Sequence, residues 1–258
     1  MKWYITGISD THNKHTHITK DLPGGDLLIH SGDFTSIGRE HEIRKFIKWF
    51  NGIDNYTHKV FIAGNHDLMF QSERLFRKKS EWFDRVEYDT EATDGKPKWL
   101  VEFLTSELNP NVYYLENSSL TIDQIKIWGS PYSPTFGRDW AFNVNRGDDA
   151  ETLWKGVPND TDIIITHTPI YGHNDRTYNT NENVGCSELY FRLSDVQPHL
   201  HFCGHIHEGY GYRVMPYKDG WGKIHTHTFN CSSVNLVYEY KNKPISFEYD
   251  FLTREINF

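Results

Sequence analysis

The chain has 258 residues, of which 37% are hydrophobic and 15% aromatic, so it can bury a substantial core and is not a disordered or low-complexity chain. Its formal net charge of −8 argues against an extended nucleic-acid groove, which needs clustered lysine and arginine to displace counterions. It has 15 histidines but only three cysteines, and no C-x-x-C pair that would indicate a zinc ribbon. Imidazole is therefore the first candidate for metal or acid–base chemistry.

Short β-rich runs recur along the chain, and each passes into a polar loop. We predict strands over residues 3–8, 27–29, 59–62, 125–128, 162–166 and 199–203. Helix-like stretches lie between them at 39–50 and 188–193. Strands that alternate with helices indicate an α/β layered fold.

The C-terminal part continues with β-rich sequence over residues 224–240 and 245–249, on either side of a turn at 241–244. We interpret these runs as consecutive strands that form an antiparallel edge or a second sheet. No linker, repeat or composition shift marks a boundary, so residues 1–258 are expected to form a single domain. The N-terminus lacks a signal-peptide pattern, and no stretch approaches the roughly 18 apolar residues of a membrane span. We expect a cytoplasmic protein with no membrane partner.

Five short motifs stand where a predicted strand gives way to a loop. They are Asp10-Thr11-His12, Gly32-Asp33, Gly64-Asn65-His66-Asp67, Thr166-His167 and Gly204-His205-Ile206-His207. Each is weak alone, because a lone histidine at a strand end is more often a hydrogen-bonded core residue than a ligand. Together they fall at the carboxyl ends of strands, the edge where α/β sheets bind ligands, and so they indicate one site.

The Asp, Asn and His side chains of these motifs supply mixed oxygen and nitrogen ligands, which suit manganese, iron or zinc better than calcium. Seven such side chains are enough for two ions. The expected sets are Asp10, His12 and His207 for one ion and Asn65, His167 and His205 for the other, with Asp33 as the bridge. Two divalent ions roughly 3.5 to 4 Å apart can clamp a phosphoryl group and share a hydroxide, which indicates a phosphoester hydrolase.

Further blocks outside these motifs extend the pattern. They are Trp128-Gly129-Ser130-Pro131, Asp139-Trp140-Ala141-Phe142-Asn143, Val184-Gly185-Cys186-Ser187-Glu188-Leu189 and Gly204-His205-Ile206-His207-Glu208-Gly209-Tyr210-Gly211. With them, the chain from Trp3 to about Asp250 resembles the calcineurin-like metallophosphoesterase superfamily. Within it, the chain is similar to the metallophosphoesterase-domain-containing branch, which is related to class III cyclic nucleotide phosphodiesterases. The resemblance implies a four-layer α/β/β/α sandwich with a dinuclear site of two divalent ions, with manganese favoured over iron, zinc or cobalt.

The resemblance also implies residue roles. It places Asp10, His12, Asp33 and His207 on the first metal, and Asp33, Asn65, His167 and His205 on the second. It brings His66 to the substrate, where this side chain stabilises the phosphorane or protonates the leaving oxygen. From the residues alone, a position between Asn65 and the acidic Asp67 suits a histidine for proton transfer. The alternative is a plain surface histidine.

The sequence after Asp33 bears on specificity. Protein Ser/Thr phosphatases of this superfamily carry an aspartate and an arginine soon after the bridging aspartate, whereas here Phe34-Thr35-Ser36-Ile37-Gly38 follows. This departure favours diesters or small phosphate compounds. The predicted substrate contacts are His173, Arg176 and Arg138. Aromatic residues near the motifs, such as Phe136 and Trp140, could stack on a nucleobase, with core packing as the alternative.

We therefore expect a metal-dependent phosphodiesterase that hydrolyses small or cyclic nucleotide diesters by in-line attack of a hydroxide that bridges two divalent metals. A DNA or RNA nuclease and a phosphomonoesterase are alternatives on the same site. A non-enzymatic scaffold or nucleotide sensor is a further one. The expected partner is a small phosphodiester or nucleotide, extensive nucleic-acid binding is not expected, and the oligomeric state stays open.

Overall fold

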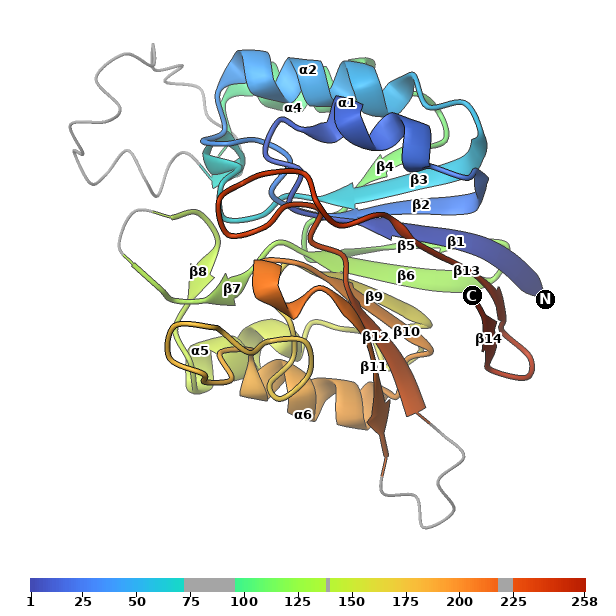
Figure 1. Cartoon of the computed structure of the whole chain (residues 1–258), viewed down its shortest axis with the longest axis vertical. Coiled ribbons are helices and arrows are strands. Elements are labelled where there is room, and N and C mark those ends of the chain that lie inside the picture. Colours follow the sequence, from blue (N-terminus) through green and yellow to red (C-terminus); the bar gives the residue numbers. More distant parts are fainter. Residues whose placement is uncertain (72–95, 138–139, 218–224) are drawn as a thin grey trace.

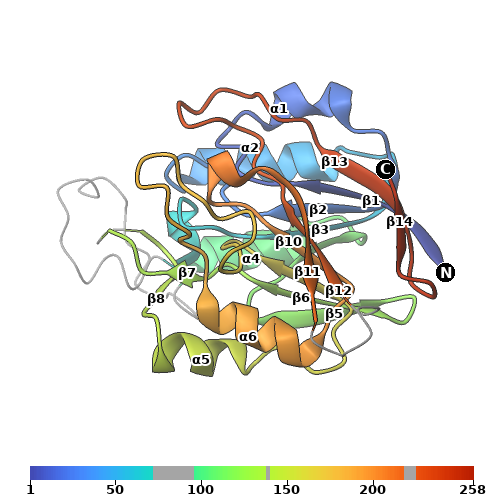
Figure 2. The same cartoon turned by 60° about the horizontal axis from the view of Figure 1, so that its bottom comes forward.

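The computed structural model describes residues 1–71, 96–137, 140–217 and 225–258. Two six-stranded sheets lie face to face, and helices cover the outer face of each (Figure 1). The turned view shows the same arrangement of layers (Figure 2). The predicted four-layer α/β/β/α sandwich is confirmed.

The first sheet contains the N-terminal strands and the last two strands of the chain. Its members are β1 (Lys2–Ile8), β2 (Gly25–Ser31), β3 (Tyr56–Ile62), β4 (Val112–Tyr114), β13 (Ile245–Asp250) and β14 (Glu255–Asn257). They run in the order β14-β13-β1-β2-β3-β4, with β1 to β4 parallel and β13 antiparallel to β1. The helices on its outer face are α1 (His15–Ile18), α2 (Glu40–Asn51) and α4 (Lys98–Ser106). Two 3-10 turns, Thr19–Asp21 and Leu68–Gln71, complete this half.

The second sheet is built from the middle of the chain. Its members are β5 (Ser118–Ile122), β6 (Ile125–Ser130), β9 (Ile163–Thr166), β10 (Leu200–Cys203), β11 (Gly211–Pro216) and β12 (His225–Asn230). They run in the order β11-β12-β10-β9-β6-β5, with β6, β9, β10 and β12 parallel. The outer face carries α5 (Asp148–Trp154) and α6 (Ser187–Val196). The short strands β7 (Ser133–Pro134) and β8 (Asn143–Val144) pair separately, and a 3-10 turn spans His207–Gly209.

Apolar side chains that point alternately to the two faces of each strand fill the layers between these elements. In β2, Leu27 and Ile29 pack between the two sheets, whereas Leu28 faces the helices. The predicted apolar face of α2 is buried there, including Phe46 and Phe50. Among the residues that the structure describes, no helix is long and apolar enough to cross a membrane.

The C-terminal part differs from the predicted consecutive strands. The strand β12 ends at Asn230 and belongs to the second sheet, while β13 belongs to the first, so the two do not pair. Between them, Val234 and Tyr240 form an isolated bridge around a tight turn at residues 235–239. This segment crosses from one sheet to the other, which a hairpin could not do. Residue 224, where the predicted run began, lies outside the described part.

A buried histidine in β10 gives a pH-dependent contribution to stability. His201 is fully buried, and its Nε2 lies 2.8 Å from Thr166 Oγ1. Burial lowers the pKa of His201 to about 3, below the ordinary value of 6.5. The neutral ring of His201 therefore contributes fully to the free energy of unfolding above pH 6.5, and this contribution is lost as the pH falls from 6.5 toward 3, because the unfolded chain then binds a proton that the folded chain does not.

We expect the variant His201→Gln, which keeps a side-chain N–H donor, to be less acid-sensitive than the parent chain. Below pH 6.5, the free energy of unfolding of the variant should fall by roughly 1 kcal/mol less per pH unit than that of the parent chain. Urea unfolding of the metal-free protein at a series of pH values measures both slopes. Equal slopes would contradict the assignment of a neutral buried imidazole.

Candidate metal centre

The five sequence motifs meet at one edge of the sandwich, at the carboxyl ends of parallel strands. Strands β1, β2 and β3 lead into the motifs of the first sheet, and β9 and β10 lead into those of the second. An isolated parallel bridge between Ser9 and Ser232 joins the two sheets at this edge. Residues far apart in the chain are thereby brought into one buried cluster.

The cluster contains three groups of side chains that could hold a metal ion, each with its ligand atoms within 4.8 Å of one another. They are Asp10, His12 and His207; His12, Asp33 and His66; and Asp33, His167 and His205. Asp33 Oδ2 lies 3.2 Å from His167 Nε2 and 3.8 Å from His12 Nε2. Its carboxylate is thus within reach of both predicted ligand sets.

The other predicted ligands complete the two ligand sets. Asp10 Oδ1 lies 3.4 Å from His207 Nε2, and the Nε2 atoms of His207 and His12 are also 3.4 Å apart. Asn65 Oδ1 is 2.9 Å from both His167 Nε2 and His205 Nδ1. The structure therefore brings all seven predicted ligand residues together.

Backbone carbonyls orient three of the imidazoles. His12 Nδ1–H donates to Thr35 O at 3.1 Å, His167 Nδ1–H donates to Ser31 O at 2.9 Å, and His207 Nδ1–H donates to Asn235 O at 3.2 Å. Since a carbonyl only accepts, each bond directs the Nε2 atom of the ring to the cluster. Such outer hydrogen bonds are the usual way in which a protein fixes the tautomer of a metal-binding histidine.

The backbone adopts uncommon conformations at this edge. Asp10, His12, Asp33 and His205 all have positive φ, between 37° and 69°. Left-handed non-glycine residues carry strain that the surrounding structure must compensate, and they concentrate at functional sites. A Cβ on Gly204 would lie 2.1 Å from Asp10 Oδ2, so this position requires glycine.

The charges in the cluster fit a divalent cation. Burial lowers the pKa of His12 to about 4 and that of His205 to about 3, so both rings are neutral and can donate a lone pair. Burial opposes protonation of His167, but the charge of Asp33 and the hydrogen bond to it raise the pKa of His167 to about 9. Asp10 raises the pKa of His207 in the same way. The two buried carboxylates thus favour positive charge at His167 and His207, and divalent ions would supply such charge.

His66 lies at the rim of the cluster and is only partly buried. Its Nδ1–H donates to Ser36 O at 2.6 Å, and its ring packs against Trp140, with centroids 4.2 Å apart. The neighbouring Asp67, which the sequence suggested as its partner, instead accepts hydrogen bonds from the backbone N–H groups of Asp33, Thr35 and Gly64. Asp67 therefore organises the loops, while a backbone carbonyl orients His66.

The predicted substrate contacts are less well placed. His173 Nδ1–H donates to Tyr171 O at 3.2 Å, and the exposed Arg176 donates from Nε to Asn181 O at 3.2 Å. These bonds hold both side chains within their own loop, and no described contact joins them to the seven candidates. Arg138 lies outside the described residues. Among the aromatic candidates, Phe136 packs on the ring of His205 at 4.7 Å.

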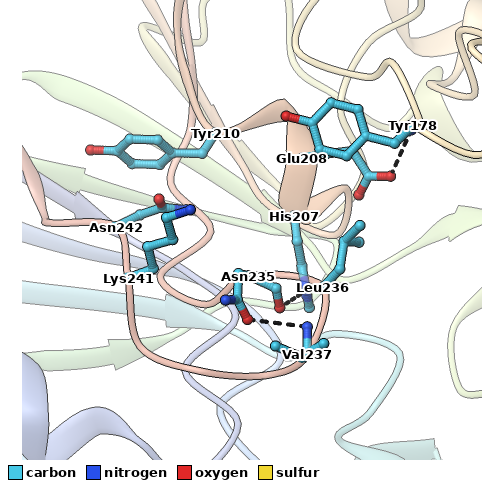
Figure 3. Close-up of a pocket in the computed structure, with 9 residues that line it drawn as sticks. All are labelled: Tyr178, His207, Glu208, Tyr210, Asn235, Leu236, Val237, Lys241 and Asn242. Atoms are coloured by element: carbon cyan, nitrogen blue, oxygen red, sulfur yellow. Dashed lines mark hydrogen bonds between the residues drawn. The ribbon is translucent and has the colours of Figure 1, made fainter.

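Sequence reasoning missed the turn at residues 235–239, which supplies the carbonyl of Asn235 to His207 and places Tyr238 over the cluster. A pocket of about 370 Å³ opens beside His207 and is lined on one side by this turn. Figure 3 shows His207 pointing to the turn, with Tyr178 and Tyr210 across the pocket. The one available signal was Asn235 itself, whose side chain favours a turn within an otherwise β-like run.

The side chain of Asn230 is hydrogen-bonded to the backbone of the motif Gly204-His205-Ile206-His207. Its Nδ2 donates to Asn174 O, Gly204 O and Ile206 O at 3.1, 3.3 and 2.8 Å. We expect Asn230→Leu to remove these three hydrogen bonds, as well as the two that Asn230 Oδ1 accepts from Ser232, and to lower the free energy of unfolding by about 2 to 4 kcal/mol. Urea unfolding measures this loss. The matched variant Asn111→Leu, at a more exposed position, should cost under about 1 kcal/mol, and equal losses would contradict the assignment.

The sequence pattern of the calcineurin-like phosphoesterases matches residues 4–209. The chain belongs to the calcineurin-like phosphoesterase family. Among curated members, Metallophosphoesterase domain-containing protein 1 of Homo sapiens is 38% identical over 92% of this chain and 68% of its own length. The UPF0046 protein T07D4.2 of Caenorhabditis elegans is 34% identical over 93% of this chain and 58% of its own length.

Solved structures agree with a calcineurin-like phosphoesterase fold. TT1561 of Thermus thermophilus matches with a TM-score of 0.54 at 13% identity, over 100% of this chain and 98% of that chain. Purple acid phosphatase PPD1 of yellow lupin matches with a TM-score of 0.50 at 13% identity, over 98% of this chain and 50% of that chain. Identities this low show the fold alone. Family membership and the candidate ligand groups together make the chain a metal-dependent phosphoesterase that uses divalent metal ions.

Proposed function

We propose that this calcineurin-like phosphoesterase hydrolyses small or nucleotide phosphodiesters, cyclic ones included, and that residues 1–258 act as one domain. The observation that supports this most is the position of Asp33. Its Oδ2 atom lies between His167 Nε2 and His12 Nε2, at 3.2 and 3.8 Å. A carboxylate shared by two ligand sets is the arrangement that a pair of metal ions needs.

In this proposal, seven side chains hold the two ions. Asp10, His12, Asp33 and His207 hold the first, and Asp33, Asn65, His167 and His205 hold the second. The nitrogen and oxygen donors fit manganese, which we favour, as well as iron, zinc or cobalt. When bound, such ions supply positive charge for the phosphoryl group and lower the pKa of water, which provides the nucleophile.

His66 is proposed to act on the substrate. Because its Nδ1–H is held by Ser36 O, the Nε2 atom is directed to the cluster, where Asp33 and His12 also converge. From this position the ring can hold a proton next to the oxygen that leaves phosphorus. The packing of Trp140 against the imidazole keeps the ring in place.

A diester differs from a monoester in its second substituent, and the structure offers space for one. The pocket beside His207 is lined by apolar side chains of the turn and by Tyr178, as Figure 3 shows. A monoester would leave this volume unused. The aromatic rings of Phe136 and Tyr238, which contact the rings of the candidate ligands His205 and His12, add flat surfaces beside the candidate centre.

A substrate panel tests the proposal. The purified chain, loaded in turn with Mn²⁺, Fe²⁺, Co²⁺ or Zn²⁺, is given bis(p-nitrophenyl) phosphate, p-nitrophenyl phosphate, 2′,3′- and 3′,5′-cyclic nucleotides, and single- and double-stranded oligonucleotides. We expect the aryl diester and at least one cyclic nucleotide to be turned over faster than the monoester. A preference for the monoester, or cleavage of oligonucleotides alone, would contradict the proposed substrate class.

A further inference from the structure

The turn at residues 235–239 is held rigidly by one asparagine. Asn235 Oδ1 accepts hydrogen bonds from Val237 N at 3.1 Å and Glu239 N at 2.9 Å. Its backbone N–H donates to Glu239 O, and its carbonyl accepts from Tyr238 N. Tyr238 is thereby fixed at a φ of 59°, a conformation that non-glycine residues adopt rarely.

The same turn is tied to the candidate metal centre. The carbonyl of Asn235 also accepts the hydrogen bond from His207 Nδ1, which Figure 3 draws together with the bond from Val237. Upstream, Ser232 Oγ donates to Asp10 Oδ2 at 2.8 Å. The turn therefore cannot shift without moving the carbonyl that orients His207, and the segment just before it contacts Asp10.

Tyr238 lies directly over the centre. Its ring centroid is 4.8 Å from that of His12, 5.4 Å from that of His207 and 6.0 Å from that of His66. The side chain is nevertheless 44% exposed. Within the described part of the chain, no hydrogen bond to its phenol oxygen is found. The exposed face of this ring is thus a flat surface at the mouth of the site.

The residues before Tyr238 continue this surface into the pocket. Leu236 and Val237 are 49% and 69% exposed, and both line the pocket beside His207 (Figure 3). Three consecutive exposed apolar or aromatic side chains are unusual on the surface of a protein and commonly mark a binding site. Here they stand next to the candidate centre, where a substituent of the substrate must lie.

We propose that this turn, residues 235–239, determines specificity: the ring of Tyr238 and the apolar side chains beside it bind the second, non-leaving substituent of a diester and select a flat aromatic group. The inference rests on the proposed diesterase function and deepens it. Tyr238 takes no part in the proton transfer. Its effect is expected in substrate binding, because a ring that stacks on the substituent contributes equally before and during the reaction.

Two diesters with the same leaving group test the inference. In bis(p-nitrophenyl) phosphate and methyl p-nitrophenyl phosphate the departing group is p-nitrophenolate, and only the retained substituent differs. For Tyr238→Ala we expect kcat/KM for the aryl compound to fall about five- to tenfold, mainly through KM, and that for the methyl compound to stay within about twofold. Tyr238→Phe, which keeps the ring, should behave as the parent chain does.

The control is Tyr4→Ala, since Tyr4 has a similar exposure of 41% and lies near the amino end of β1, whereas the carboxyl end of that strand leads into the candidate centre. It should leave both substrates unaffected. An equal loss for the two diesters in Tyr238→Ala, or no loss for either, would overturn the specificity role. If the parent chain hydrolysed neither diester, the proposed function itself would fail, and this outcome is distinct from the other two.

Discussion

Replacing Asp33 with asparagine is expected to lower the turnover of bis(p-nitrophenyl) phosphate by about a thousandfold or more, because in the proposed arrangement both metal ions would lose their shared anionic ligand. The change is nearly isosteric. An asparagine Oδ1 can still accept the hydrogen bond that the backbone of His66 donates at 2.8 Å. The variant should therefore fold, and its bound metal, measured by elemental analysis after dialysis, should fall below two ions per chain.

The matched control is Asp123→Asn, which removes an exposed carboxylate from the turn between β5 and β6. It should change neither turnover nor metal content. Turnover of Asp33→Asn within about tenfold of the parent chain would contradict the placement of Asp33 between two ions.

The variant His66→Gln is expected to separate substrates by their leaving group. With a cyclic nucleotide, whose departing ribose oxygen needs a proton, kcat should fall about 10²- to 10⁴-fold. With bis(p-nitrophenyl) phosphate, whose leaving group departs as a stable anion, the loss should stay below about tenfold. Steady-state kinetics on the two substrates measure this difference.

Metal content decides between two roles for His66, because its ring also belongs to a candidate ligand group with His12 and Asp33. We expect His66→Gln to keep the metal content of the parent chain. The control His41→Gln lies on the exposed face of α2 and should behave as the parent chain in every assay. A fall in bound metal, or equal losses on both substrates, would make His66 a ligand and contradict its role as the proton donor.

More of the candidate site than of the structure around it could be predicted from the sequence. Asp10, Asp33 and His167 each follow a short apolar run, and the carboxyl ends of parallel strands necessarily meet at one edge. Residue type and position along the chain were therefore enough to predict which side chains would meet. Burial in a strand leaves an apolar signature that a single sequence carries plainly.

The remainder depends on contacts that periodicity does not encode. The stretch Leu236, Val237, Tyr238 looks like a strand because its residues have high β-propensity, yet the side chain of Asn235 and the crossing between sheets turn it back on itself. The loop of His173 and Arg176 offers the right chemistry near a motif, but its own hydrogen bonds hold these side chains in place. Both loops border the pocket, which Tyr178 lines from one and Leu236 and Val237 from the other, and proximity in sequence could not decide which side chains line it.

The central claim is that two metal ions share Asp33. A titration of the metal-free chain with Mn²⁺, followed by electron paramagnetic resonance, tests it most directly. The account predicts binding of two ions per chain and a spectrum of exchange-coupled ions, which a bridging carboxylate produces. Saturation at one ion per chain, or two ions that give only the signal of isolated Mn²⁺, would contradict it.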